Sequence, residues 1–243
     1  MFKFYEVGGK VRDEFLGLKS KDVDYVAVPN DKLLASSWTA KEMFEILHQQ
    51  LILNDFKVFL VTENCYTIRA QFPEGHKYQG VADFVMARKE ISYIPGTRTP
   101  IVVPGTLYDD LERRDFTVNA MARDEDGSII DPFNGQEDLK HMYLRTPLPC
   151  EVTFNDDPLR ILRAVRFCIT KNLTIPYDMW DVIENYNYEE KMSVVSEERI
   201  REELYKCFKF DTILTLRYLQ EFYSLNDYIF KHTKLWLKPT NEQ

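Results

Sequence analysis

The feature that most constrains the fold is a pair of aspartates, Asp22 and Asp24, at the start of an apolar run that continues to Val28. The alternation of residues 22–28 predicts a β-strand, in which both carboxylates project from one face, roughly 7 Å apart along the backbone. That spacing suits a pair of divalent cations, which lie roughly 3.5–4 Å from each other in two-metal sites. A solvated surface strand is the alternative interpretation.

Two glycines, Gly8 and Gly9, lie upstream of this pair, after a short apolar strand and at the start of a helical turn. Glycine lets the backbone come close to a phosphate, and the first N–H groups of a helix point toward such an anion. An ordinary turn would use glycine as well. Taken together, a phosphate cradle, a short helix and paired carboxylates on a strand are typical of metal-dependent nucleotidyl transfer.

A third acid, Asp83, lies within residues 81–88, where the alternation again predicts a strand with small apolar neighbours around the acid. A charge in a strand that otherwise looks buried is a poor packing choice, which favours a functional carboxylate that joins Asp22 and Asp24. An edge strand is the alternative. The prolines and glycine between residues 90 and 103 predict a loop.

Adjacent arginines, Arg113 and Arg114, stand among three aspartates, Asp109, Asp110 and Asp115. Guanidinium groups present fixed forks of donors that suit triphosphate and ribose oxygens. The same residues would also form a structural ion-pair network. The sequence around them leaves both interpretations open.

Helical patterns dominate the second half of the chain. One helix is predicted to start at an acidic N-terminus with Pro158 in its first turn. Asp157 and Arg160 are three residues apart, so we expect them on one helical face, with Arg163 and Arg166 continuing a basic strip. An Asp acceptor beside an Arg donor suits the hydrogen-bonding edge of a base. The alternative is a salt bridge on a solvated helix.

Capping signals predict three other helices. Thr39 and Glu42 form a capping box that opens a helix through about Leu53. Ser196 and Asp211 are expected to cap two more helices in the second half. The length of 243 residues is enough for one sizeable domain and a smaller one.

Composition excludes several classes of protein. The formal net charge of −8 argues against a protein that coats nucleic acid, although a local basic strip still permits an RNA substrate. Four scattered cysteines without C-x-x-C spacing indicate reduced thiols in a cytoplasmic protein and no zinc site. No signal peptide and no long apolar run are visible, so neither secretion nor a membrane span is indicated.

The ordered motifs resemble those of the class II tRNA nucleotidyltransferase (CCA-adding enzyme) and bacterial poly(A) polymerase family. The resemblance covers roughly residues 4–225. The residues that carry it are Gly8, Gly9, Arg12, Asp13, Gly17, Asp22, Asp24, Asp83, Arg88, Asp110, Leu111, Arg113, Arg114, Asp115, Thr117, Asn119, Ala120, Asp131, Pro132, Gly135, Asp138, Leu139, Asp157, Pro158, Arg160, Arg163, Ala164, Arg166, Phe167, Glu198 and Arg199.

The resemblance implies an α+β fold. A polymerase-β-like nucleotidyltransferase head, with a mixed sheet and flanking helices, would occupy residues 1–145. An all-helical, base-selecting neck would follow over residues 146–205, and a short helical body remnant over 206–243. The chain would thus be a compact form without the C-terminal tail. One departure is Asp156, where the family usually has Glu.

The resemblance also assigns roles to residues. Asp22 and Asp24 would hold magnesium, and Asp83 would support them as the third catalytic acid. Asp157 and Arg160 would select ATP and CTP by hydrogen bonds to the base edge. The implied nucleotide-binding residues are Gly8, Gly9, Arg12, Arg113, Arg114, Asp115, Asn119, Asp157, Arg160, Arg163 and Arg166.

The implied reaction is template-independent addition of CMP and AMP, from CTP and ATP, to the 3′ acceptor end of tRNA, with Mg²⁺ as cofactor and pyrophosphate as product. A poly(A) polymerase or an A-adding enzyme that uses ATP alone would share these motifs. A non-catalytic RNA-binding module is a more remote alternative. Such a module would be expected to have lost a metal ligand, and all three carboxylates are present.

Overall fold

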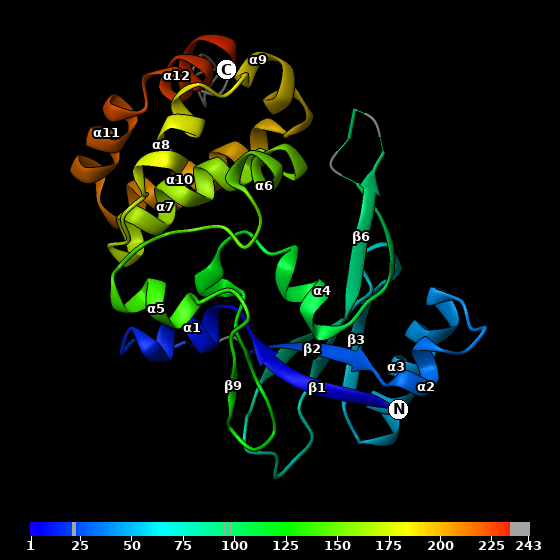
Figure 1. The fold of residues 1–243 in the computed structure, drawn as a ribbon. Helices are drawn as coiled ribbons and strands as arrows, with labels where there is room; N and C mark the ends of the chain where they lie inside the picture. Colours follow the sequence, from blue (N-terminus) through cyan, green and yellow to red (C-terminus); the bar gives the residue numbers. More distant parts are fainter. Residues whose placement is uncertain (21–22, 95, 98, 234–243) are drawn as a thin grey trace, which may run out of the picture. The chain divides into compact units, whose positions relative to one another are not determined.

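The computed structural model describes residues 1–20, 23–94, 96–97 and 99–233. The chain divides into two compact units, the first made of residues 1–92 and 100–139 and the second of residues 93–99 and the chain from Lys140 onward. The α+β class is confirmed, with a mixed sheet and flanking helices in the first unit and helices in the second (Figure 1). The predicted boundaries after residues 145 and 205 stay predictions.

The first unit is built on a seven-stranded sheet with the order β3-β4-β5-β2-β1-β8-β9. Strands β2 and β5 pair in parallel, whereas all other neighbours in this sheet pair antiparallel. The strands are β1 (Phe2–Val7), β2 (Val23–Pro29), β3 (Lys57–Thr62), β4 (Thr67–Gln71), β5 (Val81–Met86), β8 (Ala122–Arg123) and β9 (Ile129–Ile130).

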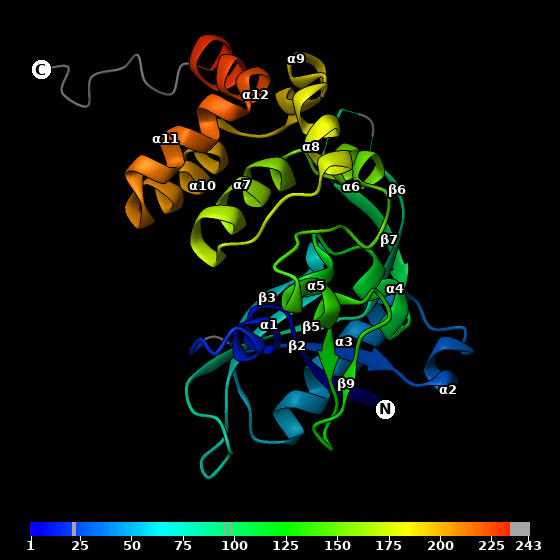
Figure 2. The same cartoon turned by 60° about the vertical axis from the view of Figure 1, so that its left-hand side comes forward.

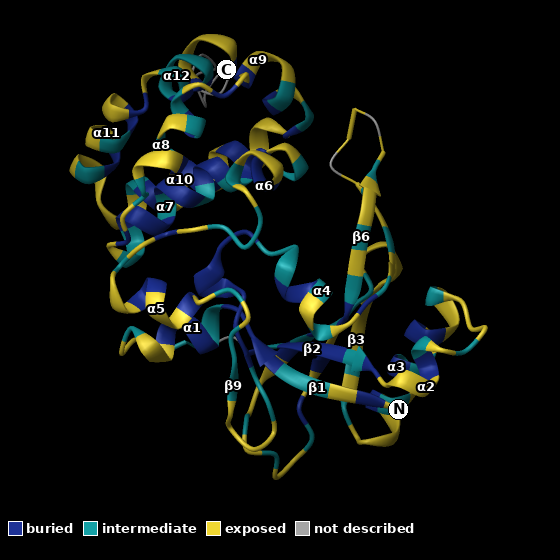
Figure 3. Ribbon diagram, in the orientation of Figure 1, coloured by how far each residue is buried: buried dark blue, intermediate teal, exposed yellow. Residues whose placement is uncertain are grey.

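The two faces of this sheet contribute to two separate hydrophobic clusters. In β2, Tyr25 and Ala27 belong to one cluster, which also contains Leu47 of helix α3. Val26, between them, belongs to the second cluster with Leu111 of helix α4. Successive side chains of a strand point to opposite faces, so the pattern in β2 assigns each residue of the strand to a face. Buried positions are dense in β2 (Figure 3).

Helix α3 (Ala40–Leu53) begins as the sequence predicts. Thr39 accepts a hydrogen bond from the backbone N–H of Glu42, and the Glu42 carboxylate accepts one from the backbone of Thr39, which completes the capping box. The remaining helical elements that begin in this unit are α1 (Gly9–Phe15), α2 (Asp31–Leu34), η1 (Glu63–Cys65), α4 (Leu107–Glu112), η2 (Thr117–Asn119) and α5 (Gly135–Lys140).

The prediction of a loop between residues 90 and 103 is wrong. The structure has two strands there, β6 (Arg88–Tyr93) and β7 (Pro100–Pro104), which form a separate two-stranded sheet (Figures 1 and 2). The β-branched residues of this stretch, such as Ile91 and Val103, favour strands. Gly96 lies in the connection between the strands, and Pro100 is the first residue of β7.

The second unit is helical in the part of the chain that the structure describes. Its helices are α6 (Cys150–Asp156), α7 (Leu159–Lys171), α8 (Tyr177–Glu184), α9 (Tyr188–Lys191), η3 (Met192–Val194), α10 (Glu197–Phe210), α11 (Thr212–Glu221), α12 (Tyr223–Asp227) and the π-helical turn η4 (Tyr228–His232). Asp211 caps α11 as predicted, by accepting from the backbone N–H of Leu214. Over the described ranges no helix has the length and apolarity that crossing a bilayer requires.

Helix α3 offers a direct test of the first unit's core. Leu47 is fully buried, while Leu53 at the end of the same helix is 81% exposed. We expect Leu47→Ala to lower the free energy of unfolding by about 2–5 kcal/mol, because it leaves a cavity, and Leu53→Ala by less than about 0.5 kcal/mol. Urea titrations followed by circular dichroism measure both. Equal losses in the two variants would contradict this placement of α3.

Candidate active site

Two of the predicted acids, Asp24 and Asp83, lie side by side in the sheet. Strands β2 and β5 are in parallel register with Asp24 opposite Asp83. Neighbouring strands are about 4.8 Å apart, so the two residues occupy adjacent positions on one face. That face is the one to which Val26 belongs, opposite the face of Tyr25. Asp22 lies outside the described residues.

The carboxylate of Asp83 is held by an arginine that sequence reasoning missed. Arg69 of β4 stands directly opposite Asp83, and its Nε and Nη2 donate to Oδ1 and Oδ2 of that carboxylate, each at 2.7 Å. Strand β5 therefore has neighbours on both sides, and the edge-strand alternative for Asp83 is wrong. The signal available in the sequence was a charged residue between Ile68 and Ala70 in a predicted strand.

Gly8 lies where the backbone approaches both an acid and an arginine. It precedes α1 with φ 71° and ψ −134°, a conformation that residues with a side chain rarely adopt. A Cβ atom at this position would stand 3.4 Å from Nη1 of Arg114 and 3.7 Å from Oδ2 of Asp24. The turn between β1 and α1 thus places backbone, carboxylate and guanidinium within a few ångströms of one another.

Asp110 anchors both predicted arginines. Its side chain is fully buried; Arg113 Nε donates to Oδ1 at 3.1 Å, and Arg114 Nη2 donates to Oδ2 at 3.0 Å. Burial by itself would raise the pKa of Asp110, but the two guanidinium groups outweigh it and hold that pKa below its ordinary value. The ion-pair network that the sequence left open is therefore present. It also fixes where the two forks point.

A second buried network links α1 to the segment around η2. Arg12 donates through Nη1 to Oδ1 of Asn119 at 2.6 Å and through Nε to Asp13 at 2.8 Å. Asn119 in turn donates through Nδ2 to Asp115 at 2.9 Å. All four side chains are buried. The structure thus brings together Arg12, Asp115 and Asn119, and each has a polar partner within the unit.

The second unit places Asp157 differently from the prediction. Helix α6 ends at Asp156 and α7 begins at Leu159, so Asp157 precedes the helix and does not share a helical face with Arg160. The following proline explains this, because Pro158 disfavours the α conformation at the residue before it. Asp157 has extended backbone angles instead, φ −146° and ψ 97°.

Hydrogen bonds fix the conformation of Asp157 and Arg160 at the start of α7. Asp157 Oδ1 accepts from the N–H of Leu159 at 3.1 Å, and its carbonyl oxygen accepts from the N–H of Arg160 at 3.0 Å. The Arg160 guanidinium donates through Nη1 to the carbonyl oxygen of Thr153 in α6 at 3.2 Å. Asp157 and Arg160 are thus both fixed at the junction of α6 and α7.

The basic strip on α7 is partly neutralised. Arg166 donates through Nε to Glu203 of α10 at 2.5 Å, and Lys206 bonds the other oxygen of the same carboxylate at 2.9 Å. Glu203 is buried; burial opposes its ionisation, but Arg166 and Lys206 hold its pKa below the usual value. Sequence reasoning missed Glu203, although it stands next to Leu204 and one helical turn from Ile200 and Cys207. Arg163 lies half-buried on α7.

One described carboxylate, that of Asp24, is of the kind that a hard divalent cation prefers. Its Oδ2 lies within van der Waals distance of a Cβ placed at Gly8. Across the residues that the structure describes, no three His, Cys, Asp or Glu side chains gather as a metal-binding group. Asp83 has both of its oxygens bonded to Arg69, which suits a supporting acid better than a ligand.

The chain is similar in sequence to a known protein family and to a curated protein. A family model described as the poly A polymerase head domain matches residues 4–145. The multifunctional CCA protein of Thioalkalivibrio sulfidiphilus (strain HL-EbGR7) is 42% identical over 168 residues, which cover 68% of this chain and 34% of that protein.

The chain is also similar to solved structures of CCA-adding enzymes. The Thermotoga maritima CCA-adding enzyme complexed with tRNA matches with a TM-score of 0.69 at 27% identity, over 93% of this chain and 48% of that one. A CCA-adding enzyme in apo form II matches with a TM-score of 0.72 at 28% identity, over 98% of this chain and 52% of that one. This chain thus spans about a third of the curated relative and about half of the solved ones.

The family model covers more than half of the chain, and its match begins before Gly8 and ends after Asn119. It therefore includes the acids of β2 and β5, the turn at Gly8 and both arginine networks. The protein belongs to the poly A polymerase head domain family, the CCA-adding and poly(A) polymerase group that its motifs resemble.

Proposed function

We propose that this protein adds CMP and AMP to the 3′ end of tRNA, using CTP and ATP and releasing pyrophosphate. The observation that carries the proposal is the placement of Asp24 beside Asp83 in the sheet, with Asp24 and Arg114 both close to Gly8. Members of this family are metal-dependent nucleotidyltransferases, and the solved relatives include one complexed with tRNA and one with CTP.

Each part of the site has a role in this proposal. Asp22 and Asp24 would hold Mg²⁺, and Asp83, fixed by Arg69, would support them electrostatically. When bound, Mg²⁺ would neutralise charge on the phosphates and lower the pKa of the attacking 3′-hydroxyl. The 3′-hydroxyl oxygen would attack the α-phosphorus of the nucleotide as its proton passes to solvent. The bond between the α-phosphorus and the oxygen that bridges it to the β-phosphorus would break, and pyrophosphate would leave with that oxygen.

The residues of the first unit would bind the triphosphate and ribose. Asp110 fixes the forks of Arg113 and Arg114, so that little side-chain entropy is lost when these donors bind phosphate oxygens. Gly8 and Gly9 would allow the backbone to come near the phosphates. Arg12, Asp115 and Asn119 would complete this part of the site.

The junction of α6 and α7 would select the base. Asp157 presents a carboxylate and Arg160 a guanidinium, an acceptor and a donor that match the polar edge of cytosine or adenine. Arg163 and Arg166 would extend this surface. Arg166 already bonds Glu203, so its proposed role is to hold neighbouring groups in position and not to bind the nucleotide by itself.

Incubating the protein with tRNA that lacks its 3′ end, Mg²⁺ and each labelled nucleotide in turn tests the proposal. Incorporation of CMP followed by AMP supports it. Incorporation of AMP alone, in chains of one or many, indicates an A-adding enzyme or a poly(A) polymerase. No incorporation by folded protein contradicts nucleotidyl transfer.

The carboxylate of Asp24 should be essential for turnover. We expect Asp24→Ala to reduce nucleotide addition by about a thousandfold or more, because it removes a charge that acts on the reacting phosphates. Asp126→Ala, at an exposed turn of the same unit, is the control and should retain activity. Near-normal turnover of Asp24→Ala with Mg²⁺ would refute the assignment.

The choice of base should depend on Asp157 and Arg160. We expect Asp157→Ala and Arg160→Ala to lose about 1–3 kcal/mol of discrimination each, roughly fivefold to 150-fold, measured by competing CTP, ATP, UTP and GTP. Asp157→Asn keeps an oxygen for the N–H of Leu159 and separates base selection from helix capping. Unchanged selectivity in all three variants would leave the pair with a structural role only.

The buried carboxylate of Asp110 should contribute strongly to stability. We expect Asp110→Asn to lower the free energy of unfolding by about 3 kcal/mol at pH 7, because two guanidinium groups lose their counter-charge. Since the folded pKa of Asp110 is lowered, this contribution is fully present above the unfolded pKa of about 4 and is lost as the pH falls below it. Urea titrations from pH 7 to pH 3 should therefore show the variant and the parent protein converging in acid. A constant difference would contradict the ion pair.

A further inference from the structure

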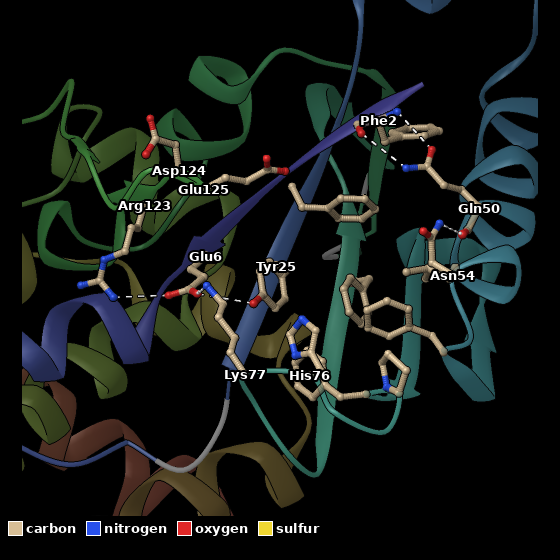
Figure 4. Close-up of a pocket in the computed structure, with 16 residues that line it drawn as sticks. Phe2, Glu6, Tyr25, Gln50, Asn54, His76, Lys77, Arg123, Asp124 and Glu125 are labelled. Atoms are coloured by element: carbon tan, nitrogen blue, oxygen red, sulfur yellow. Dashed lines mark hydrogen bonds and ion pairs between the residues drawn. The ribbon is translucent and has the colours of Figure 1, made fainter.

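The first unit contains a cavity of about 530 Å³ on the sheet face that is opposite Asp24 and Asp83. Tyr25 of β2 and Phe84 of β5 line it, and they directly follow the two acids in their strands. Because successive side chains of a strand point to opposite faces, the sheet itself separates this cavity from the candidate active site. Figure 4 shows its lining residues.

Aromatic rings make up one side of the cavity. Tyr25 and Phe84 are stacked, with ring centroids 5.2 Å apart and planes 6° from parallel, and Phe56 meets Phe84 edge-on at 5.1 Å. Phe72 is stacked on His76 at 4.5 Å. A flat ring is the shape that such a set of faces and edges accommodates best.

A buried acid, Glu6, stands at one end of the cavity. It is 3% exposed and accepts hydrogen bonds from Tyr78 Oη at 2.7 Å and from Tyr25 Oη at 3.4 Å. Lys77 Nζ lies 3.2 Å and Arg123 Nη1 3.3 Å from its carboxylate oxygens. The two cations that line the cavity are therefore both bonded to Glu6.

The remaining charge at this rim is negative. Asp124 and Glu125 also line the cavity, and Glu125 is exposed and reaches toward the rings (Figure 4). Asp124 accepts hydrogen bonds from the backbone N–H groups of Asp126 and Ser128 at 3.1 and 2.8 Å. Among the residues that line the cavity, three acids thus accompany two cations, and both cations are already bonded to Glu6. Lys3, which does not line the cavity, also interacts electrostatically with Asp124 and Glu125.

The far end of the cavity offers another acceptor. Asn54 lines this end and donates through Nδ2 to the carbonyl oxygen of Gln50 at 2.6 Å, and its amide oxygen is an acceptor. Aromatic faces attract cations through their quadrupole, and acidic or amide oxygens accept hydrogen bonds from an ammonium group. Rings and oxygens therefore favour the same kind of ligand.

We propose that this cavity binds a small organic cation that carries an aromatic ring. The ring would pack against Phe56 and Phe72, and the ammonium group would lie toward Glu125 and Asp124. A ligand with the same ring and a carboxylate in place of the ammonium would meet Asp124 and Glu125 as like charges, and it would have to compete with Glu6 for Lys77 and Arg123. This inference does not rest on the proposed function.

Tryptamine and indole-3-propionate form a matched pair of probes, because they share the indole ring and differ in the sign of their charge. We expect ligand-observed NMR titrations of the full chain to give tryptamine a Kd of about a millimolar or lower, the affinity expected for a ligand with about a dozen non-hydrogen atoms. Indole-3-propionate should bind about tenfold more weakly, since one charge reversal at close range has roughly this effect.

Two variants locate the binding. Glu125→Lys should weaken tryptamine about tenfold, whereas Glu63→Lys, the same change at an exposed residue of η1 that does not line the cavity, should leave its Kd unchanged. Asn54→Trp places a ring at the far end of the cavity and should abolish binding, with circular dichroism verifying the fold. Tighter binding of indole-3-propionate, or equal effects of Glu125→Lys and Glu63→Lys, would overturn the proposal.

Discussion

The parallel pairing of β2 with β5 is the constraint on which the rest of the first unit depends. It sets Asp24 opposite Asp83, and the antiparallel pairing of β5 with β4 then sets Arg69 opposite Asp83. A shift of either register by one residue would turn an acid toward the hydrophobic cluster around Tyr25 and Phe84, where an unpaired carboxylate is strongly disfavoured. Burial of the aromatic residues on one face therefore fixes the acids on the other.

A buried carboxylate orders the arginines of each unit. Asp110 bonds Arg113 and Arg114 in the first unit, and Glu203 bonds Arg166 and Lys206 in the second. Burying an acid is costly unless cations compensate it, so each acid determines where the cations can lie. The cations are thus held in place by contacts within the protein itself. The ion-pair network of Arg113 and Arg114 is therefore compatible with their proposed role in phosphate binding, because both interpretations place the two side chains in the same way.

Local sequence patterns predicted several elements of this fold, and the resemblance to a known family predicted its class. The strands around Asp24 and Asp83 and the capping box at Thr39 follow from local rules, because alternation and capping act within a few residues. The bond between Arg69 and Asp83 depends on which strands become neighbours, and nothing local determines this. Asp157 could have been placed correctly from the sequence, since the effect of Pro158 on the preceding residue is itself local. The strands β6 and β7 were missed because turn residues between them outweighed their β-branched content.

The alternation of β2 and β5 gives the sheet two chemically different faces built from the same two strands. Each acid is followed by an aromatic residue, so that Asp24 and Tyr25, like Asp83 and Phe84, share a peptide bond but lie on opposite faces. Tyr25 stacks on Phe84 on one face of the sheet, just as Asp24 lies beside Asp83 on the other face. Packing on the aromatic face and the spacing of the acids are therefore not independent: a change that separates the two rings acts on the strand pair that holds the two carboxylates together.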